Sequence, residues 1–215
     1  MDETSSLRGG MTMKAYRWLF AFLLAFVLSG CAKGGTHLIP IRYEPQRDFA
    51  SLSARIGPTL GLVDFRDERP DPLYIGRHTP YEGTPSYFKS DPFPLSQAMM
   101  ESISRTLSRF GVKTLSIPSW DGKPESLKGI EADSVLRVEI RRFWTEGRAA
   151  AFRTHAKTSV HLVIHLGVKR EGKVFTRNVE VEKEGTWARL TPQRVEALVN
   201  QALAEILDAF FANPY

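Results

Sequence analysis

The sequence predicts an α+β protein, with a mostly antiparallel sheet of about four to five strands packed by two amphipathic helices, after an N-terminal lipoprotein signal peptide. Three observations support this prediction. Several segments of the second half alternate apolar and polar residues, as strands with one wet face do. Two other segments repeat apolar residues every three or four positions, as helices lying on a sheet do. A short apolar run follows basic residues near the start, which is typical of an exported protein.

The predicted signal peptide covers residues 1–30. An uncharged, mostly apolar run over residues 18–28 follows Lys14 and Arg17. The run is too short to be a membrane-spanning helix, which needs roughly 20 apolar residues. An acidic pair at the very start does not fit a basic leader, so we expect translation to begin at Met11 or Met13.

The apolar run ends in a motif that resembles the bacterial lipobox, formed by Leu28, Ser29, Gly30 and Cys31. In that motif the cysteine thiol receives diacylglycerol before cleavage. We therefore expect lipidation of Cys31, a lipidated tether over residues 31–37, and attachment to the membrane through acyl chains, each buried CH₂ contributing about 0.8 kcal/mol. An unmodified, buried cysteine is the alternative. Because Ala32 rather than Asp follows, the pattern resembles lipoproteins of the outer membrane that face the periplasm.

The composition excludes several classes of protein. The chain has 29 Lys and Arg against 24 Asp and Glu, without a dense basic run, so we expect no nucleic-acid binding. A single cysteine excludes an intrachain disulfide, a four-cysteine zinc site and a dithiol redox pair. We expect no metal and no cofactor, and the oligomeric state does not follow from the sequence.

A single α/β domain is expected over residues 38–215. Residues 38–43 contain a proline and are predicted as a weak edge strand. Residues 59–65 are mostly apolar and follow Pro58, which predicts a central strand. Residues 66–94 hold six prolines and no regular period, so they are predicted as a long loop. Loops of this length are uncommon inside a compact domain and tend to be functional or disordered.

This loop is a candidate partner-binding surface. A charge cluster at its start is followed by aromatic residues that we expect to be exposed, and the candidates are Arg66, Asp67, Arg69, Tyr81 and Phe88. The alternative is that local ion pairs and aromatic packing fold the loop back onto the domain, because charge runs usually form solvated faces.

Both predicted helices carry an apolar stripe. The first follows two prolines, covers residues 95–110 and ends at Gly111. The second covers residues 192–212, with Thr191 as the N-cap residue and a proline at the first helical position. Methionines in the first helix are expected to fill the core rather than to bind a metal.

The remaining strands are predicted from alternation over residues 112–117, 134–143, 158–168 and 174–185. The last three form an antiparallel meander with a tight hairpin at residues 170–173 and one wet face. On this face, Arg137, Arg141, His161 and His165 are further candidates for partner contacts. The two histidines are four residues apart on a strand, about 13 Å, which is too far to share a metal ion without another strand.

Six features follow one another along the chain: the lipobox, residues 63–69 with Ile75 and Gly76 after them, residues 107–111, residues 136–140, the long hairpin, and the terminal helix. Their order resembles the YajG family of bacterial envelope lipoproteins over nearly the whole mature chain. The predicted loop is longer and richer in proline than the pattern of that family. The resemblance implies a small α/β domain similar to accessory lipoproteins of envelope transport systems, without catalytic residues.

We therefore expect a lipid-anchored lipoprotein that is not an enzyme and serves as an accessory, adaptor or assembly protein of an envelope protein complex. The first alternative is a carrier that holds a lipid or another apolar ligand between the sheet and the helices. The second is a hydrolase, although the sequence has no Gly-x-Ser-x-Gly elbow, glycine-rich phosphate loop or His-Glu-x-x-His helix.

Overall fold

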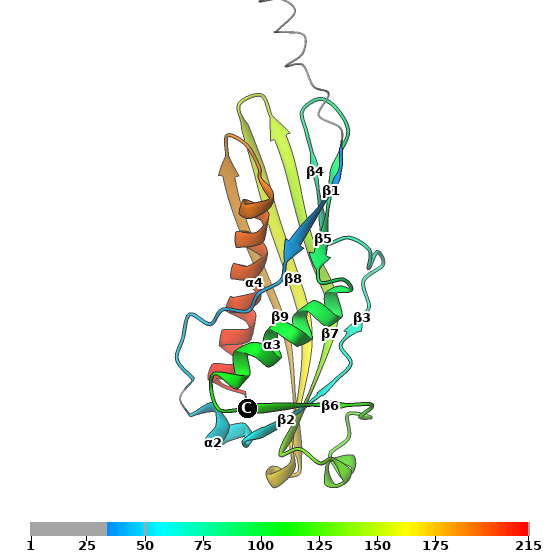
Figure 1. Cartoon of the computed structure of the whole chain (residues 1–215), viewed down its shortest axis with the longest axis vertical. Helices are drawn as coiled ribbons and strands as arrows, with labels where there is room; N and C mark the ends of the chain where they lie inside the picture. Colours follow the sequence, from blue (N-terminus) through cyan, green and yellow to red (C-terminus); the bar gives the residue numbers. More distant parts are fainter. Residues whose placement is uncertain (1–33, 50, 215) are drawn as a thin grey trace, which may run out of the picture. The chain divides into compact units, whose positions relative to one another are not determined.

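The computed structural model describes residues 34–49 and 51–214. The predicted signal peptide, the lipobox and Cys31 lie outside the described residues and stay predictions. The described residues form an α+β unit with one sheet, and this part of the predicted fold class is confirmed (Figure 1).

The sheet has nine strands and is mixed, so the prediction of about four to five mostly antiparallel strands is wrong in number and in pairing. The strands are β1 (Thr36–Pro40), β2 (Thr59–Val63), β3 (Arg66–Asp67), β4 (Gly76–Thr79), β5 (Ser86–Asp91), β6 (Lys113–Ile117), β7 (Ser134–Ala150), β8 (Arg153–Val168) and β9 (Lys173–Trp187). The meander β7, β8 and β9 is antiparallel, as predicted. In contrast, β2, β3 and β4 all pair in parallel with β7, and β1 pairs in parallel with β5.

The 17-residue strand β7 organises this arrangement. One of its edges pairs with β8 along nearly its full length. Its other edge pairs with three short strands in succession, which are β2, then β3, then β4. These partners lie far from β7 in the sequence, and local alternation carries no information about such pairings.

Residues 66–94 are therefore not the structureless loop that was predicted, because they contain β3, β4 and β5. Each of these strands has only two to six residues, which is too short for a period to stand out among the prolines. An edge strand is present as β1, but it covers Thr36–Pro40 instead of the predicted residues 38–43.

The two predicted amphipathic helices are confirmed as α3 (Leu95–Ser108) and α4 (Pro192–Ala212), and a short helix α2 (Leu52–Ile56) was not predicted. In Figure 1, α3 and α4 lie in front of the sheet, with α4 packed on β8 and β9 and α3 on β5 and β6. Thr191 precedes α4, but its side chain makes no capping hydrogen bond. Within the described residues, no helix combines the length and the apolar composition that crossing a bilayer requires.

A β-bulge lies in β7 where the register shifts between Ile140 and Arg142. Before the bulge, Val138 and Ile140 face the core, and after it Phe143 faces the core. The extra residue is Arg141, and it reverses the alternation of the strand. The predicted strand ended near this shift because a period of two no longer holds across it.

The segment that follows β1 is held between α3 and α4 by Tyr43, which is buried. Its backbone N–H donates to Ser102 Oγ at 2.5 Å, and its carbonyl accepts from Thr106 Oγ1 at 2.6 Å. Its hydroxyl donates to Asp208 Oδ1 at 2.9 Å, while the other Asp208 oxygen accepts the Gln46 N–H at 2.9 Å. Burial, together with the charge and hydrogen bond of Asp208, raises the pKa of Tyr43, so the phenol keeps its proton and remains a donor.

Replacing Tyr43 with Phe tests this contact. The change keeps the ring but leaves the buried Asp208 carboxylate with one donor fewer, so we expect the free energy of unfolding to fall by about 1–3 kcal/mol, measured by urea denaturation. Tyr81→Phe is the matched control, because the Tyr81 side chain is exposed, and it should change stability by less than about 0.5 kcal/mol. Equal stability of the two variants would show that the Tyr43 hydroxyl contributes nothing.

Candidate functional site

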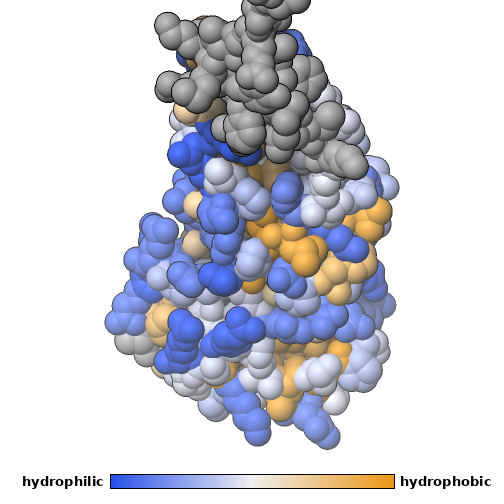
Figure 2. Space-filling model, turned by 45° about the horizontal axis from the view of Figure 1, so that its top comes forward, coloured by the Kyte–Doolittle hydropathy of each residue, from blue (hydrophilic) through white to orange (hydrophobic). Residues whose placement is uncertain are grey.

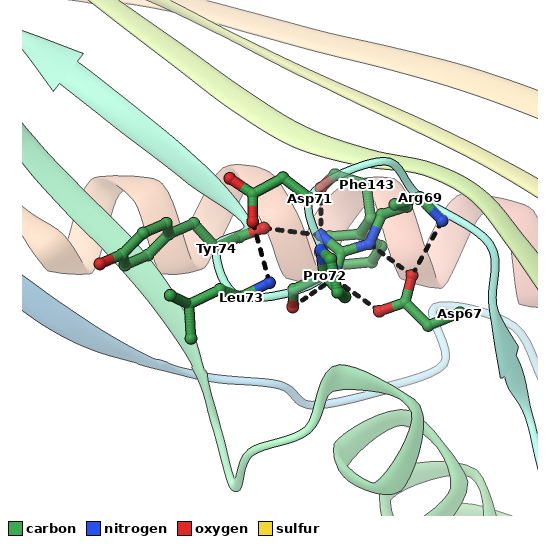
Figure 3. Close-up of polar contacts among 7 residues, drawn as sticks. All are labelled: Asp67, Arg69, Asp71, Pro72, Leu73, Tyr74 and Phe143. Carbon is green, nitrogen blue, oxygen red and sulfur yellow. Dashed lines mark hydrogen bonds and ion pairs between the residues drawn. The ribbon is translucent and has the colours of Figure 1, made fainter.

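Arg69 organises the loop between β3 and β4 (Figure 3). Its guanidinium donates to both carboxylate oxygens of Asp67, at 2.7 Å each. It also donates to the carbonyl oxygens of Pro72, Tyr74 and Phe143 at 3.0, 2.7 and 3.1 Å. All five N–H groups of the guanidinium are thereby used, and the residue is 8% exposed. Arg69 and Asp67 therefore hold the loop together and offer little surface to the predicted partner.

The bond to Phe143 explains why an arginine is needed here. Along the edge of β7, β3 pairs up to Ile140 and β4 begins to pair at Thr145. The Phe143 carbonyl lies in the gap between these two strands, where no strand supplies an N–H. A buried carbonyl without a hydrogen-bond donor lowers the stability of a fold by about 1–3 kcal/mol. The Arg69 guanidinium supplies the donor that a neighbouring strand would otherwise provide.

The loop that Arg69 holds contributes to an apolar strip, which we define as Leu38, Leu73, Tyr74, Tyr87, Lys89 and Phe93. Three of these side chains are unusually exposed for their size: 58% for Leu38, 42% for Leu73 and 45% for Phe93. In Figure 3, Leu73 extends from the loop on the side opposite to Phe143. Figure 2 shows hydrophobic residues gathered in patches between hydrophilic ones on the surface.

Contacts along β5 connect the members of the apolar strip. The rings of Tyr74 and Tyr87 lie 4.7 Å apart between centroids. The Lys89 ammonium lies 3.9 Å from the centre of the Phe93 ring, a cation–π contact. Leu38 is paired with Lys89 across β1 and β5, so the two side chains share one face. Tyr87 and Lys89 share one face of β5, so these contacts join five members of the strip into one surface with one positive charge, and Leu73 precedes Tyr74 in the loop.

The strip borders the edge strand β1. Within the described residues β1 pairs with no strand other than β5, so its second edge has no strand partner. The side chain of Asn200 on α4 closes the lower end of this edge: it donates to the Pro40 carbonyl at 3.0 Å and accepts from the Arg42 N–H at 2.9 Å. An edge strand beside exposed apolar side chains is a surface onto which an extended peptide segment can bind.

The wet face of the meander is confirmed, and its charges are largely compensated within the fold. Glu139 lies at the centre of this face, with Arg141 at 2.6 Å, His165 at 3.4 Å and Arg137 at 3.7 Å. Arg141 also pairs with Glu68, which follows β3. Arg137 and His165 are mostly buried, so of the four candidates on this face they offer little surface to a partner.

The protonation states follow from this arrangement. Burial acts to raise the pKa of Glu139, but the hydrogen bond from Arg141 and the charges of His165, Arg141 and Arg137 outweigh it and hold the pKa below the usual range. Burial and the charge of Arg137 lower the pKa of His165 despite the nearby Glu139. The cluster therefore contains a carboxylate and a neutral imidazole at neutral pH.

The two histidines do not form a joint site. His161 Nε2 lies 2.5 Å from Asn178 Oδ1 and His165 Nδ1 lies 2.8 Å from Thr176 Oγ1, so each contacts β9 rather than the other. Across residues 34–49 and 51–214, no three potential metal ligands come together.

The other candidates in the predicted loop divide into two groups. Arg66 on β3 and Tyr81 in the turn after β4 are exposed. Phe88 is 2% exposed and belongs to the core, so the expectation that it is available to a partner is wrong. The reason is that it alternates with the outward residues Tyr87 and Lys89 on β5, a pattern that shows only once the segment is known to be a strand.

Comparison with known proteins defines the fold. No protein-family model matches the chain, and no curated protein matches it either. Among solved structures, the chain is similar to protein XCC0632 of family DUF330 from Xanthomonas campestris, with 16% identity, a TM-score of 0.53 and coverage of 82% of this chain and 91% of that one. This similarity shows the fold and no more.

Two further solved structures are more distant. One is the hypothetical protein CT253 from Chlamydia trachomatis, with 14% identity, a TM-score of 0.44 and coverage of 71% of this chain and 95% of that one. The other is the lipoprotein GNA1162 from Neisseria meningitidis, with 15% identity, a TM-score of 0.39 and coverage of 70% of this chain and 98% of that one. The resemblance to the YajG family stays a prediction.

The structural role of Arg69 predicts a large effect of Arg69→Lys. Lysine keeps the charge but cannot reach three carbonyls and a bidentate carboxylate at once, so we expect a loss of about 1–3 kcal/mol in the free energy of unfolding and faster proteolysis within residues 70–74. Arg66→Lys, at an exposed neighbour, is the control and should leave both measurements unchanged. If Arg69→Lys has the same stability and proteolysis rate as that control, Arg69 is not needed to bind the Phe143 carbonyl between β3 and β4.

Proposed function

We propose that this chain is a lipid-anchored lipoprotein of the bacterial envelope, with its folded part on the periplasmic side of the outer membrane. In this proposal it is an accessory or adaptor protein of the YajG type, without enzymatic activity, that binds another protein of an envelope complex. The lipobox-like end of the apolar leader supports the anchor, and Ala32 after Cys31 supports the outer membrane.

The apolar strip is the observation that carries the adaptor role. Three large apolar side chains are kept in water, although a monomer gains nothing from exposing them together. The loop that presents Leu73 and Tyr74 is fixed by Arg69, so binding does not have to order it first. The partner that fits is an extended protein segment with apolar side chains and a carboxylate for Lys89, lying along β1.

The carrier alternative has less support. A carrier needs an apolar cavity between the sheet and the helices, but Val160 and Ile164 on β8 and Leu203 and Phe210 on α4 meet there, fully buried. A groove of about 440 Å³ lies at the surface instead, and polar residues such as Asn200 contribute to its wall. Most of the residues around that groove are polar or charged, which does not favour a lipid tail.

The anchor is tested by Cys31→Ser. We expect this change to abolish labelling with radioactive palmitate and to move the protein out of the membrane fraction, because the thiol is the acceptor of the diacylglycerol. Ser29→Ala keeps a small residue in the motif and should leave labelling and fractionation as they are. Labelling that persists in Cys31→Ser would rule out the proposed anchor.

The adaptor surface is tested by photo-cross-linking in intact cells. With p-benzoylphenylalanine in place of Phe93, we expect one discrete adduct, identified by mass spectrometry, that falls at least tenfold when Leu73→Asp is added to the same chain. The same cross-linker in place of Arg109, an exposed residue at the end of α3, is the control and should not give that adduct. Identical products from both positions would contradict binding at the strip.

A further inference from the structure

A second pair of exposed aromatic side chains lies at one end of the sheet. Phe152 is 92% exposed in the turn between β7 and β8, and Tyr81 is 70% exposed in the turn between β4 and β5. The parallel register of β4 and β7 pairs Thr79 with Arg148, so both strands reach their turns at the same end. Two turns that are separate in the sequence therefore each present an aromatic ring at the same end of the sheet.

Basic side chains surround these two turns. Arg148 is 76% exposed at the end of β7 and pairs with Glu146 at 3.5 Å, and Arg153 is exposed at the start of β8. The segment between β9 and α4 adds Arg189, which lies close enough to His78 on β4 for its charge to lower the pKa of that imidazole, after the larger effect of burial. Glu82 is the acidic residue of the β4–β5 turn. The end of the sheet is thus aromatic and mainly positive.

The first described residues lie at the same end. Gly35 accepts a hydrogen bond from the Tyr87 N–H at 2.8 Å, and Gly34 lies against the backbone of Pro85, next to the β4–β5 turn. Cys31 precedes Gly34 by three residues, and a chain spans at most about 3.6 Å per residue. A lipid on Cys31 would therefore begin no more than about 11 Å from Gly34, whose own position is next to the β4–β5 turn.

We propose that this end of the sheet is a second membrane-contact site, which binds the surface of a bilayer with anionic lipids. Phe152 and Tyr81 enter the interfacial layer, where aromatic rings are favoured, and Arg148, Arg153 and Arg189 face the lipid phosphates. The inference rests on the proposed lipidation of Cys31, because the short connection brings these turns to the leaflet. The second contact would fix the orientation of the folded part, with the long β7–β8 hairpin extending away from the membrane.

The strand β8 supplies a matched pair of positions to test this. Phe152 lies just before its first residue, and Glu171, in the 3₁₀ turn η2 (Lys169–Glu171), lies just beyond its last. At about 3.3 Å per residue, the 16-residue strand separates the two turns by about 50 Å. Both positions are exposed, so either can be replaced without disturbing the core.

The experiment uses the full, acylated protein with either Phe152→Cys or Glu171→Cys. Acylation blocks the Cys31 thiol, so the new cysteine is the only site for the environment-sensitive dye NBD. The labelled protein is reconstituted into vesicles of phosphatidylethanolamine and phosphatidylglycerol, with or without brominated lipids. We expect bromolipids to quench NBD at position 152 at least twofold and to leave NBD at position 171 unchanged.

Three other results overturn the inference. If the protein floats with the vesicles but NBD is quenched equally weakly at positions 152 and 171, the protein is anchored and the second membrane contact does not exist. Unchanged quenching at position 152 after Arg148→Glu and Arg153→Glu, at low salt, removes the role of the lipid phosphates. Two reactive thiols per chain, in protein that does not float, refute the lipidation itself and with it this inference.

Discussion

The edge of β7 is the constraint on which the rest of the structure depends. A buried strand cannot leave its carbonyl and N–H groups without partners, and this edge is completed by three short strands rather than by one long strand. Between β3 and β4 the ladder is interrupted, and the guanidinium of Arg69 supplies the donor that Phe143 needs. The same guanidinium binds the carbonyls of the connecting loop. One side chain therefore both completes the hydrogen bonding of the sheet and fixes the conformation of the loop.

This coupling explains how a proline-rich connection becomes a binding surface. The prolines limit the conformations open to the chain, and Arg69 selects one in which Tyr74 packs on Tyr87 of β5 and Leu73 extends from the loop. The apolar strip is therefore built on the sheet and shares its rigidity. The charged face around Glu139 differs, because its ionic groups satisfy one another and present little unbalanced charge.

The sequence was informative where a signal was long and local. The strands of the meander and the two helices extend over ten residues or more, and their periods predicted them. The strands β3, β4 and β5 were missed because each has only two to six residues, and β3 and β4 pair with a strand that comes more than fifty residues later in the chain. Arg69 was taken for a surface residue because nothing in its sequence neighbourhood indicates a carbonyl of β7. Leu38, Leu73 and Phe93 were not singled out, since isolated apolar residues in irregular sequence do not show that they will meet.

The path of the first described residues has a mechanical consequence. β1 runs parallel to β5, and the chain then passes between α3 and α4, where Tyr43 is held at its backbone and at its hydroxyl. A force applied at the N-terminal side of β1 acts along the strand, so it loads the hydrogen bonds of the β1–β5 ladder in shear, all at once, instead of opening them one by one. Tension that exceeds this resistance then reaches the Tyr43 clamp, and through it both helices share the load.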